Sequence, residues 1–275
     1  MKKQLDKNFL DIVGVENLIL AWTEFVKGKR GKRNVQEFVF NLMDNILLLH
    51  ENLINKTYEH DSYKSFNISD PKPRNIHKAT VRDRLLHHAI HRVLYLFFDK
   101  AFIADSFSCR IGKGTHKALN RLRSFGYKVS QNNTRTCWVL KCDIKKFFAN
   151  IDHKILIDIL RQYIPDENII WLLREIIGSF RTNGTPQLNN VPQSCNICYK
   201  IEAIGLPLGN LTSQLLVNIY MNEFDQFVKH KLKAKYYIRY ADDFVILSEN
   251  KNWLEKQIPK IRDFLRSKLK LELHE

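Results

Sequence analysis

Two neighbouring carboxylates, Asp242 and Asp243, have the chemistry needed to bind a hard metal ion. They lie between two runs rich in β-branched and aromatic residues, Tyr236–Tyr240 and Phe244–Leu247. This pattern predicts a β-hairpin whose turn holds Ala241 and the two aspartates. Because side chains alternate along a strand, adjacent aspartates point to different sides, and only one can aim fully at a given ion. Taken alone, the stretch is equally compatible with an ordinary polar turn.

A third aspartate, Asp143, ends a similar apolar run, Trp138–Cys142. Hard cations such as Mg²⁺ take oxygen ligands, usually one or two carboxylates together with substrate phosphates. Two such ions, ~3.5–4 Å apart, can clamp the attacking and leaving oxygens of an in-line phosphoryl displacement. We expect Asp143 and Asp242 to build this clamp from adjacent strand ends, with Asp243 beside them. The predicted cofactors are two Mg²⁺ ions, with Mn²⁺ as the alternative.

Two cations, Lys72 and Arg74, lie in the proline-rich stretch Asp70–Arg74. Its prolines exclude a helix and favour a stiff extended loop, so we predict two short strands within 61–78. A planar guanidinium suits bidentate phosphate contact, and a lysine supplies a point charge. Either residue alone would be an ordinary surface cation. Together, on a stiffened hairpin, they predict a contact with a triphosphate.

Helices are expected wherever apolar residues recur every three to four positions, because those positions share one helix face. The segments with this pattern are 8–26, 34–54, 80–97, 154–164, 167–179, 215–222 and 253–271. The polar segment 181–198, rich in Asn, Gly and Pro, predicts a loop. Three histidines, His87, His88 and His91, lie on the third helix. Since no acidic or thiol partner is evident nearby, we assign them structural roles.

The chain is strongly basic, with 44 Lys and Arg against 29 Asp and Glu in 275 residues, a formal net charge of +15. This excess favours an anionic partner, above all a phosphate backbone. The glycine-broken basic loop 27–33 is equally compatible with a phosphate contact and with a solvated linker. A membrane partner is not expected, because no apolar run approaches the ~20 residues of a spanning helix.

The five cysteines are few and odd in number, which predicts reduced thiols in a cytoplasmic protein. Cys195 and Cys198 have metal-ligand spacing, but no second pair completes a tetrahedral site. The N-terminus is not followed by an unbroken apolar region, so no secretion signal is predicted.

The aspartate motifs resemble the palm of a reverse transcriptase: Tyr-Ala-Asp-Asp between apolar strands, preceded by Asp143–Phe148. Residues 74–84 are similar to the fingers motif of bacterial reverse transcriptases, in which the matching arginine binds nucleotide. The resemblance implies an α/β (α+β) right-hand polymerase, with an antiparallel palm sheet backed by helices. It implies mostly helical fingers in 1–136, with the nucleotide-binding hairpin near 61–78, and a palm in 137–275, with fingers-derived helices partly interleaved.

The resemblance also assigns roles around the palm. Phe148, five positions after Asp143, matches a steric gate that would collide with a 2′-hydroxyl and so favours deoxynucleotides. Arg110 and Gly112 match a segment that borders the template and the nucleotide. This segment is a glycine-punctuated basic loop with Thr115 as the expected helix N-cap, and its backbone amides suit phosphate. Since the family usually continues into a thumb after the last residues of this chain, we expect the thumb to be missing.

The most specific motif is Leu208-Gly209-Asn210-x-x-Ser213-Gln214. Most bacterial reverse transcriptases, including those of group II introns and retrons, have Gln in place of Leu208 and Pro in place of Gln214. This chain instead resembles reverse transcriptases of diversity-generating retroelements. A glutamine could hydrogen-bond the incoming nucleotide and penalise poor geometry, whereas leucine offers little such check. The resemblance therefore implies error-prone copying, especially opposite template adenines. It places Leu208 and Gly209 at the nucleotide, and Ser213 and Gln214 at the template or primer.

The function implied is RNA-directed DNA polymerase activity in a diversity-generating retroelement. The partners implied are template RNA, a DNA or RNA primer and dNTPs, and the resemblance adds a small basic accessory protein. One alternative is a retron or group II intron-type reverse transcriptase, which the Ser213-Gln214 pair disfavours. The other is a non-catalytic RNA-binding remnant without a thumb, which the three retained aspartates disfavour.

Overall fold

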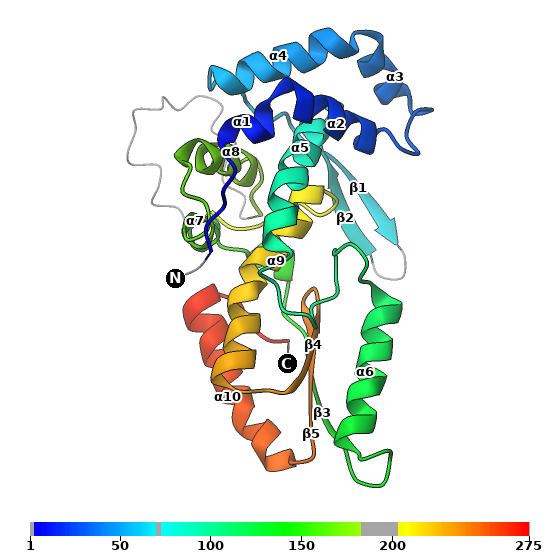
Figure 1. Ribbon diagram of the computed structural model, residues 1–275, viewed down its shortest axis with the longest axis vertical. Coiled ribbons are helices and arrows are strands. Elements are labelled where there is room, and N and C mark those ends of the chain that lie inside the picture. Colours follow the sequence, from blue (N-terminus) through cyan, green and yellow to red (C-terminus); the bar gives the residue numbers. More distant parts are fainter. Residues whose placement is uncertain (1–2, 70–72, 183–202, 275) are drawn as a thin grey trace. The chain divides into compact units, whose positions relative to one another are not determined.

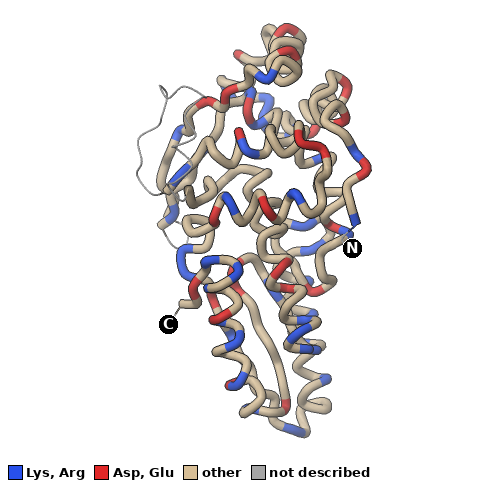
Figure 2. The backbone as a smooth tube through the Cα atoms, turned by 90° about the vertical axis from the view of Figure 1, so that its left-hand side faces the viewer, with Lys and Arg blue, Asp and Glu red and all other residues tan. Residues whose placement is uncertain are grey.

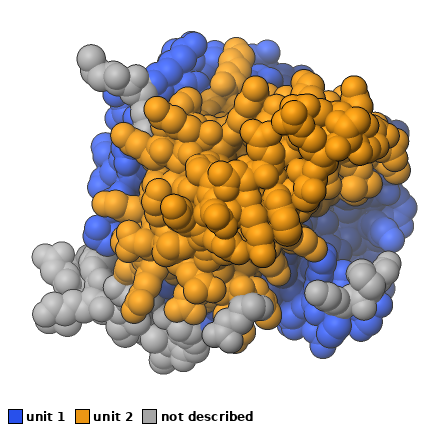
Figure 3. Space-filling model, turned by 90° about the horizontal axis from the view of Figure 1, so that it is seen from below, with its two compact units in different colours: residues 1–98, 153–215 blue, residues 99–152, 216–275 orange. Residues whose placement is uncertain are grey.

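The computed structural model of the chain divides into two compact units, each assembled from two separate stretches (Figures 1 and 3). The described residues are 3–69, 73–182 and 203–274. Unit 1 comprises residues 1–98 and 153–215, and unit 2 comprises residues 99–152 and 216–275. Each unit has its own small antiparallel sheet, of two strands in unit 1 and three in unit 2. The fold is thus mixed α/β, as the sequence predicts, while the fingers and palm boundary at 136–137 remains a prediction.

Most helices of unit 1 lie where the apolar spacing places them. They are α1 (Phe9–Val13), α2 (Val15–Phe25), α3 (Arg33–Phe40), α4 (Leu42–Ile54), α5 (Val81–Phe98), α7 (His153–Arg161), α8 (Glu167–Gly178) and the first turn of α9 (Leu211–Gln226). The predictions of single helices over 8–26 and 34–54 are wrong, because each is interrupted by one non-helical residue. Gly14 lies between α1 and α2 and caps both helices, and Asn41 lies in the same way between α3 and α4. Both residue types have low helix propensity.

The hairpin predicted within 61–78 is present in unit 1. Its strands β1 (Lys64–Ser69) and β2 (Pro73–Lys78) pair antiparallel, from Lys64 opposite Lys78 to Ser69 opposite Pro73. All residues of β1 and the first three of β2 are exposed. A two-stranded hairpin is marginally stable by itself in water, so its attachment to the rest of unit 1 matters.

The sheet of unit 2 has the order β3-β5-β4, with every pair antiparallel. Its strands are β3 (Trp138–Cys142), β4 (Tyr236–Tyr240) and β5 (Asp243–Ser248). The other elements of this unit are α6 (Thr115–Val129), the 3₁₀ turn η1 (Phe147–Asn150), the bulk of α9, the π-helical turn η3 (Phe227–Lys231) and α10 (Lys251–Leu269). Because β5 is central, the strands that carry the three aspartates are direct neighbours.

Both faces of this sheet are covered by helices of unit 2 (Figure 1). Ile238 and Leu247 pack in one cluster with Phe125 of α6. On the opposite face, the ring of Phe224 in α9 lies 5.0 Å from that of Phe244, and α10 packs along β5 and β3. The antiparallel sheet backed by helices therefore agrees with the sequence prediction.

Lys and Arg residues are spread along the whole backbone (Figure 2). The helix α6 carries Lys117, Arg121, Arg123 and Lys128 and no acidic residue. Within the described part of the chain, no helix combines the length and apolar character that a membrane span requires.

Candidate active site

Three carboxylates meet at one end of the unit 2 sheet. Asp143 directly follows β3, Asp242 lies between β4 and β5, and Asp243 is the first residue of β5. One carboxylate oxygen of each lies within 4.8 Å of those of the other two. In the described residues, no other group of three or more His, Cys, Asp or Glu side chains is gathered in this way. The structure therefore brings together the three aspartates that the sequence selected.

The pairing of the strands explains why these residues meet. Cys142 of β3 stands opposite Phe244 of β5, so the next residue of one strand meets the preceding residue of the other. Those two residues are Asp143 and Asp243. Asp242 follows Ala241 in the connection from β4, and Tyr240 pairs with Asp243. The predicted three-residue turn is thus one residue too long, because Asp243 already belongs to β5.

The turn requires an unusual backbone at Ala241, whose φ of +56° lies in the left-handed region. This conformation costs a non-glycine residue about 1–2 kcal/mol. The favoured two-residue hairpin connections have positive φ at their first central position, which Ala241 occupies here. Something in the surroundings must hold the turn in place.

Arg239 of β4 holds that turn from behind. Its side chain is fully buried, and its Nη1 donates to the carbonyl oxygen of Ala241 at 2.9 Å. Its Nε and Nη2 donate to the two carboxylate oxygens of Asp225 in α9, each at 2.8 Å. Burial lowers the pKa of Arg239, but Asp225 raises it by more, so the guanidinium stays charged. The only sequence signal for this residue is a cation inside an apolar strand.

The donor set of the three aspartates fits the predicted metal. All available ligand atoms are carboxylate oxygens, which Mg²⁺ and Mn²⁺ prefer over nitrogen or sulfur. Asp243 is exposed, which leaves room for the phosphate oxygens and waters that such ions retain. The site can therefore bind divalent cations together with a phosphorylated substrate.

The two phenylalanines after Asp143 differ in environment. Phe147 is buried, as expected of a core residue, and its ring lies 5.6 Å from that of Phe148 in an edge-on arrangement. Phe148 is half-buried. Its role as a steric gate stays a prediction.

The side chain of Arg110, which the sequence predicts at the template, makes hydrogen bonds within the protein. Its Nε donates to Asp99 Oδ1 at 2.7 Å, and its Nη1 donates to the carbonyl oxygens of Ile103 and Ser106. Its Nη2 donates to the carbonyl oxygen of Asp99. These bonds tie the loop before α6 together, so the side chain has a structural role, and the template contact remains a prediction.

The loop around Gly112 leads into α6, and this helix begins with a different N-cap residue from the one predicted. Gly112 is exposed and has a φ of +70°, which favours glycine. The N-cap of α6 is Gly114, so the prediction that Thr115 caps the helix is wrong. Thr115 is already helical, and its hydroxyl donates to the Tyr240 hydroxyl at 3.2 Å, beside the aspartate turn.

In unit 1, the structure brings the strand of Arg74 next to the Leu208 loop. The His77 backbone N–H donates to the Leu208 carbonyl oxygen at 2.9 Å, and the Asn210 amide donates to the His77 carbonyl oxygen at 3.1 Å. Gly209 has a φ of +107°, and a Cβ there would lie 2.8 Å from the Ile76 side chain. Only glycine fits this close approach.

For the remaining predicted site residues, the structure gives the position in the fold and the exposure of the side chain. Arg74 is exposed on β2. Ser213 is buried and Gln214 half-buried in the first turn of α9, and their template or primer contacts stay predictions. Lys72, Cys195 and Cys198 lie outside the described residues, as does nearly all of the predicted loop 181–198.

The structural role of His87 stands, but the prediction that it lacks an acidic neighbour is wrong. His87 Nε2 lies 3.2 Å from His60 Nε2, and His60 Nδ1 lies 3.7 Å from a carboxylate oxygen of Asp83. All three side chains are buried. Burial lowers the pKa of His87 to about 3, so it is neutral at physiological pH.

Residues 64–275 match the family described as "Reverse transcriptase (RNA-dependent DNA polymerase)". Among curated relatives, the group II intron-encoded protein LtrA of Lactococcus lactis is 26% identical over 270 residues, covering 74% of this chain and 41% of that protein. Protein YkfC of Escherichia coli is 24% identical over 238 residues, covering 75% and 59%. An "Uncharacterized 91 kDa protein in cob intron" of Schizosaccharomyces pombe is 29% identical over 156 residues, covering 56% and 17%.

A solved structure, the "Partial Cas6-RT-Cas1--Cas2 complex", aligns with a TM-score of 0.47 at 18% identity, over 95% of this chain and 43% of that one. The chain spans 17% to 59% of the length of the three curated relatives named above. The family match extends over most of the sequence and contains the hairpin, the Leu208 loop and all three aspartates. The chain therefore belongs to the reverse transcriptase (RNA-dependent DNA polymerase) family.

Proposed function

We propose that this chain catalyses RNA-directed DNA synthesis with two divalent metal ions. The observation that carries the proposal is the meeting of Asp143, Asp242 and Asp243 on neighbouring strands of a reverse transcriptase family chain. Asp143 and Asp242 hold the ions, and Asp243 supports the site. Bound there, the ions would supply positive charge that stabilises the phosphoryl transfer.

The chain's own residues bind and orient the reactants. Arg74, with Lys72, holds the triphosphate through its guanidinium, and Gly209 lets the backbone come close to the nucleotide. Phe148 excludes a 2′-hydroxyl and selects deoxynucleotides. Rate acceleration in this scheme comes from positioning and from charge neutralisation rather than from covalent chemistry.

The nucleic-acid partners are a template RNA and a DNA or RNA primer. The formal net charge of +15 and the acid-free helix α6 support binding of a phosphate backbone. Gly112 and Gln214 contact the template or primer in this proposal, with Arg110 and Ser213 supporting their loop and helix from within. A small basic accessory protein joins the complex.

We further propose that synthesis is error-prone, as in a diversity-generating retroelement. Leu208 in place of glutamine and the Ser213-Gln214 pair support this type. The second candidate is a group II intron-type enzyme. It is favoured by relatives that include LtrA and a protein in a cob intron.

Primer extension on a defined RNA template with Mg²⁺ and dNTPs, followed by sequencing of the products, tests the proposal. Asp242→Asn is the negative control for contaminating polymerase activity. Extension with errors concentrated at template adenines supports the retroelement type, and faithful extension supports the intron type. If the chain binds the primer-template but does not extend it, the proposed activity is wrong for this chain.

A further inference from the structure

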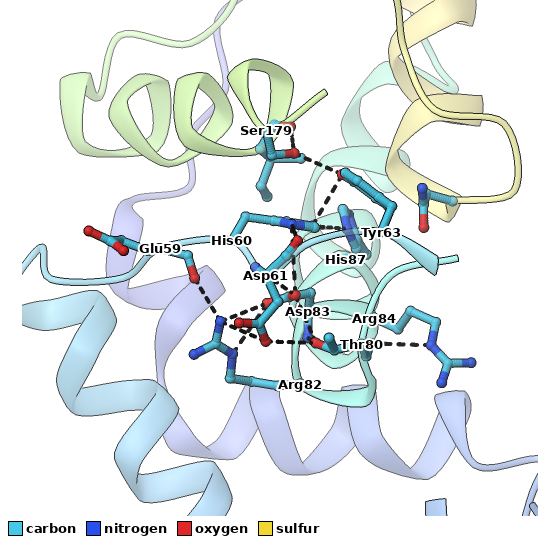
Figure 4. A network of polar contacts seen from close by, with 12 residues as sticks. Glu59, His60, Asp61, Tyr63, Thr80, Arg82, Asp83, Arg84, His87 and Ser179 are labelled. Atoms are coloured by element: carbon cyan, nitrogen blue, oxygen red, sulfur yellow. Dashed lines mark hydrogen bonds and ion pairs between the residues drawn. The ribbon is translucent and has the colours of Figure 1, made fainter. Parts of the chain in front are cut away.

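The β1–β2 hairpin stands on a buried polar network at its base (Figure 4). All of β1 and the first half of β2 are exposed, so among the described residues the hairpin is supported where the second half of β2 meets the Leu208 loop and at its base. The segments that enter and leave it, by contrast, run past the N-terminal turn of α5. The side chain at the centre of that crossing is Asp83, which is fully buried.

Asp83 binds both ends of the hairpin at once. Its Oδ2 accepts from the backbone N–H of Asp61, before β1, at 3.1 Å. The same oxygen accepts from the Thr80 hydroxyl, after β2, at 2.7 Å. Its Oδ1 accepts from the Tyr58 hydroxyl at 2.8 Å and from Arg82 Nε at 3.3 Å. One carboxylate therefore closes the base of the hairpin.

The network continues to the Leu208 loop. His60, next to Asp61, meets His87 through their Nε2 atoms at 3.2 Å. His87 lies one turn beyond Asp83 on α5, and its Nδ1 lies 2.6 Å from the Thr212 hydroxyl in the first turn of α9. The ring centroids of the two histidines are 5.4 Å apart, as expected for nitrogens that face each other head-on and share one proton.

The physical cost of breaking this base is high. Hydrogen bonds to an ionised carboxylate are shorter and stronger than neutral ones, and a buried carboxylate left short of donors is penalised. Burial by itself would raise the pKa of Asp83, but His60, Thr80 and Arg82 together hold it below its usual range. The carboxylate is therefore charged, and it accepts hydrogen bonds from all four of the donors named above.

We propose that Asp83 and Thr80 are positioning residues that set the direction of the β1–β2 hairpin and hold it in register with the Leu208 loop. The proposal rests on the proposed function, in which the hairpin cations bind the triphosphate of a dNTP. Neither residue touches the substrate. They act through the hairpin, so their loss weakens nucleotide binding before it affects the phosphoryl transfer itself.

The Thr80 hydroxyl offers the sharpest test, because it can be removed with almost no change in shape. Thr80→Val deletes the bonds of this hydroxyl to the carboxylates of Asp83 and Asp61 and to the Asp83 backbone N–H, whereas Thr80→Ser keeps them. Thr23→Val is the matched control, since that hydroxyl bonds the Leu20 carbonyl oxygen on α2, outside the network. Steady-state primer extension gives KM for dNTP and kcat separately, and thermal unfolding reports stability.

We expect Thr80→Val to raise KM for dNTP about tenfold, with kcat within about twofold of the parent. Thr80→Ser and Thr23→Val should keep the parent KM. A lower melting temperature and a lower kcat at unchanged KM would show that Thr80 is merely structural, and would overturn the proposal. Binding of the RNA primer-template should stay unchanged in all three variants.

Hydrogen–deuterium exchange of the hairpin amides tests the same proposal without any need for activity. In Thr80→Val, the amides of 64–69 and 74–78 should exchange faster than in the parent and in Thr80→Ser. Equal exchange in all variants would overturn the positioning role. If the parent protein does not extend primers but the exchange difference is found, the proposed polymerase function fails and the anchoring of the hairpin stands.

Discussion

Asp242 contributes negative charge to the sheet end and no part of the basic surface. Asp242→Asn keeps the size of the side chain while weakening metal binding, so we expect DNA synthesis to fall by at least ~10³-fold. Binding of RNA should remain nearly intact, because it depends on Lys and Arg. Primer extension and a filter-binding assay measure the two effects. Asp158→Asn, at an exposed position on α7, is the matched control. Equal loss of RNA binding and synthesis would contradict the site assignment.

Leu208 is the residue on which the fidelity hypothesis depends. Leu208→Gln adds a group that can hydrogen-bond the nucleotide and discriminate against poor geometry. We expect misincorporation opposite template adenine to fall by ~2–10-fold, the worth of one net hydrogen bond. Sequencing of extension products measures the error spectrum, with Leu208→Met as the apolar control. An error spectrum that Gln leaves unchanged would argue against the hypothesis.

Arg239 supports the aspartate turn, and its removal should be costly for stability. Arg239→Met leaves Asp225 buried without its cation, which destabilises by ~3–5 kcal/mol. For comparison, Arg92→Met breaks a partly exposed pair with Glu24, worth ~0–1 kcal/mol. Urea unfolding followed by circular dichroism gives both free energies. Similar costs for the two variants would show that the buried pair adds nothing special.

At the scale of single residues, the sequence predicted the metal-binding carboxylates of the site but not the residue that holds their turn in place. Asp143, Asp242 and Asp243 could be selected because carboxylates at strand ends have a recognisable pattern. Arg239 could not, because its meaning comes from Asp225, fourteen positions earlier and on a different element. Such a contact exists only once α9 has packed on the sheet.

Among the elements, α5 carries a pH dependence of its own. Burial lowers the pKa of His87 to about 3, and those of His88 and His91 to about 4, below the ordinary value near 6.5. Between these values the unfolded chain binds protons that the folded chain does not, so stability is lost as the pH falls. His87 alone contributes up to about 1.4 kcal/mol per pH unit below 6.5.

The free energy of unfolding should therefore decrease steadily from pH 7 to pH 5. Denaturant titrations at several pH values measure this decrease. His87→Asn, which cannot titrate, should give a shallower pH dependence than the parent. An identical dependence in both proteins would mean that His87 is not held neutral by its surroundings.

Elements with a strong local signature were predictable, and interruptions were not. The strands around Asp242 and the hairpin at 64–78 follow from alternation, prolines and β-branched residues. Gly14 and Asn41 break two helices although the apolar spacing continues across them. Periodicity averages over many positions, so a single residue that leaves the helical conformation does not disturb it.

For the whole molecule, the family could be predicted from a few motifs, while the exact residue limits of the two compact units could not. The sequence places the fingers in 1–136 and the palm in 137–275, with fingers-derived helices partly interleaved, and these bounds remain a prediction. In the structure, residues 99–152 belong with 216–275, and 153–215 belong with the first 98 residues. This pairing depends on contacts between residues far apart in the chain, which leave no local trace in composition or charge.

The interleaving of the two units also sets an order of events during synthesis. Neither unit can be completed when its first half leaves the ribosome, because unit 1 waits for residues up to 215 and unit 2 for those up to 275. The early halves must stay apart from other chains until then, with apolar faces still uncovered. It follows that a cut at 136–137 would separate both units from parts of themselves, and that neither piece should fold.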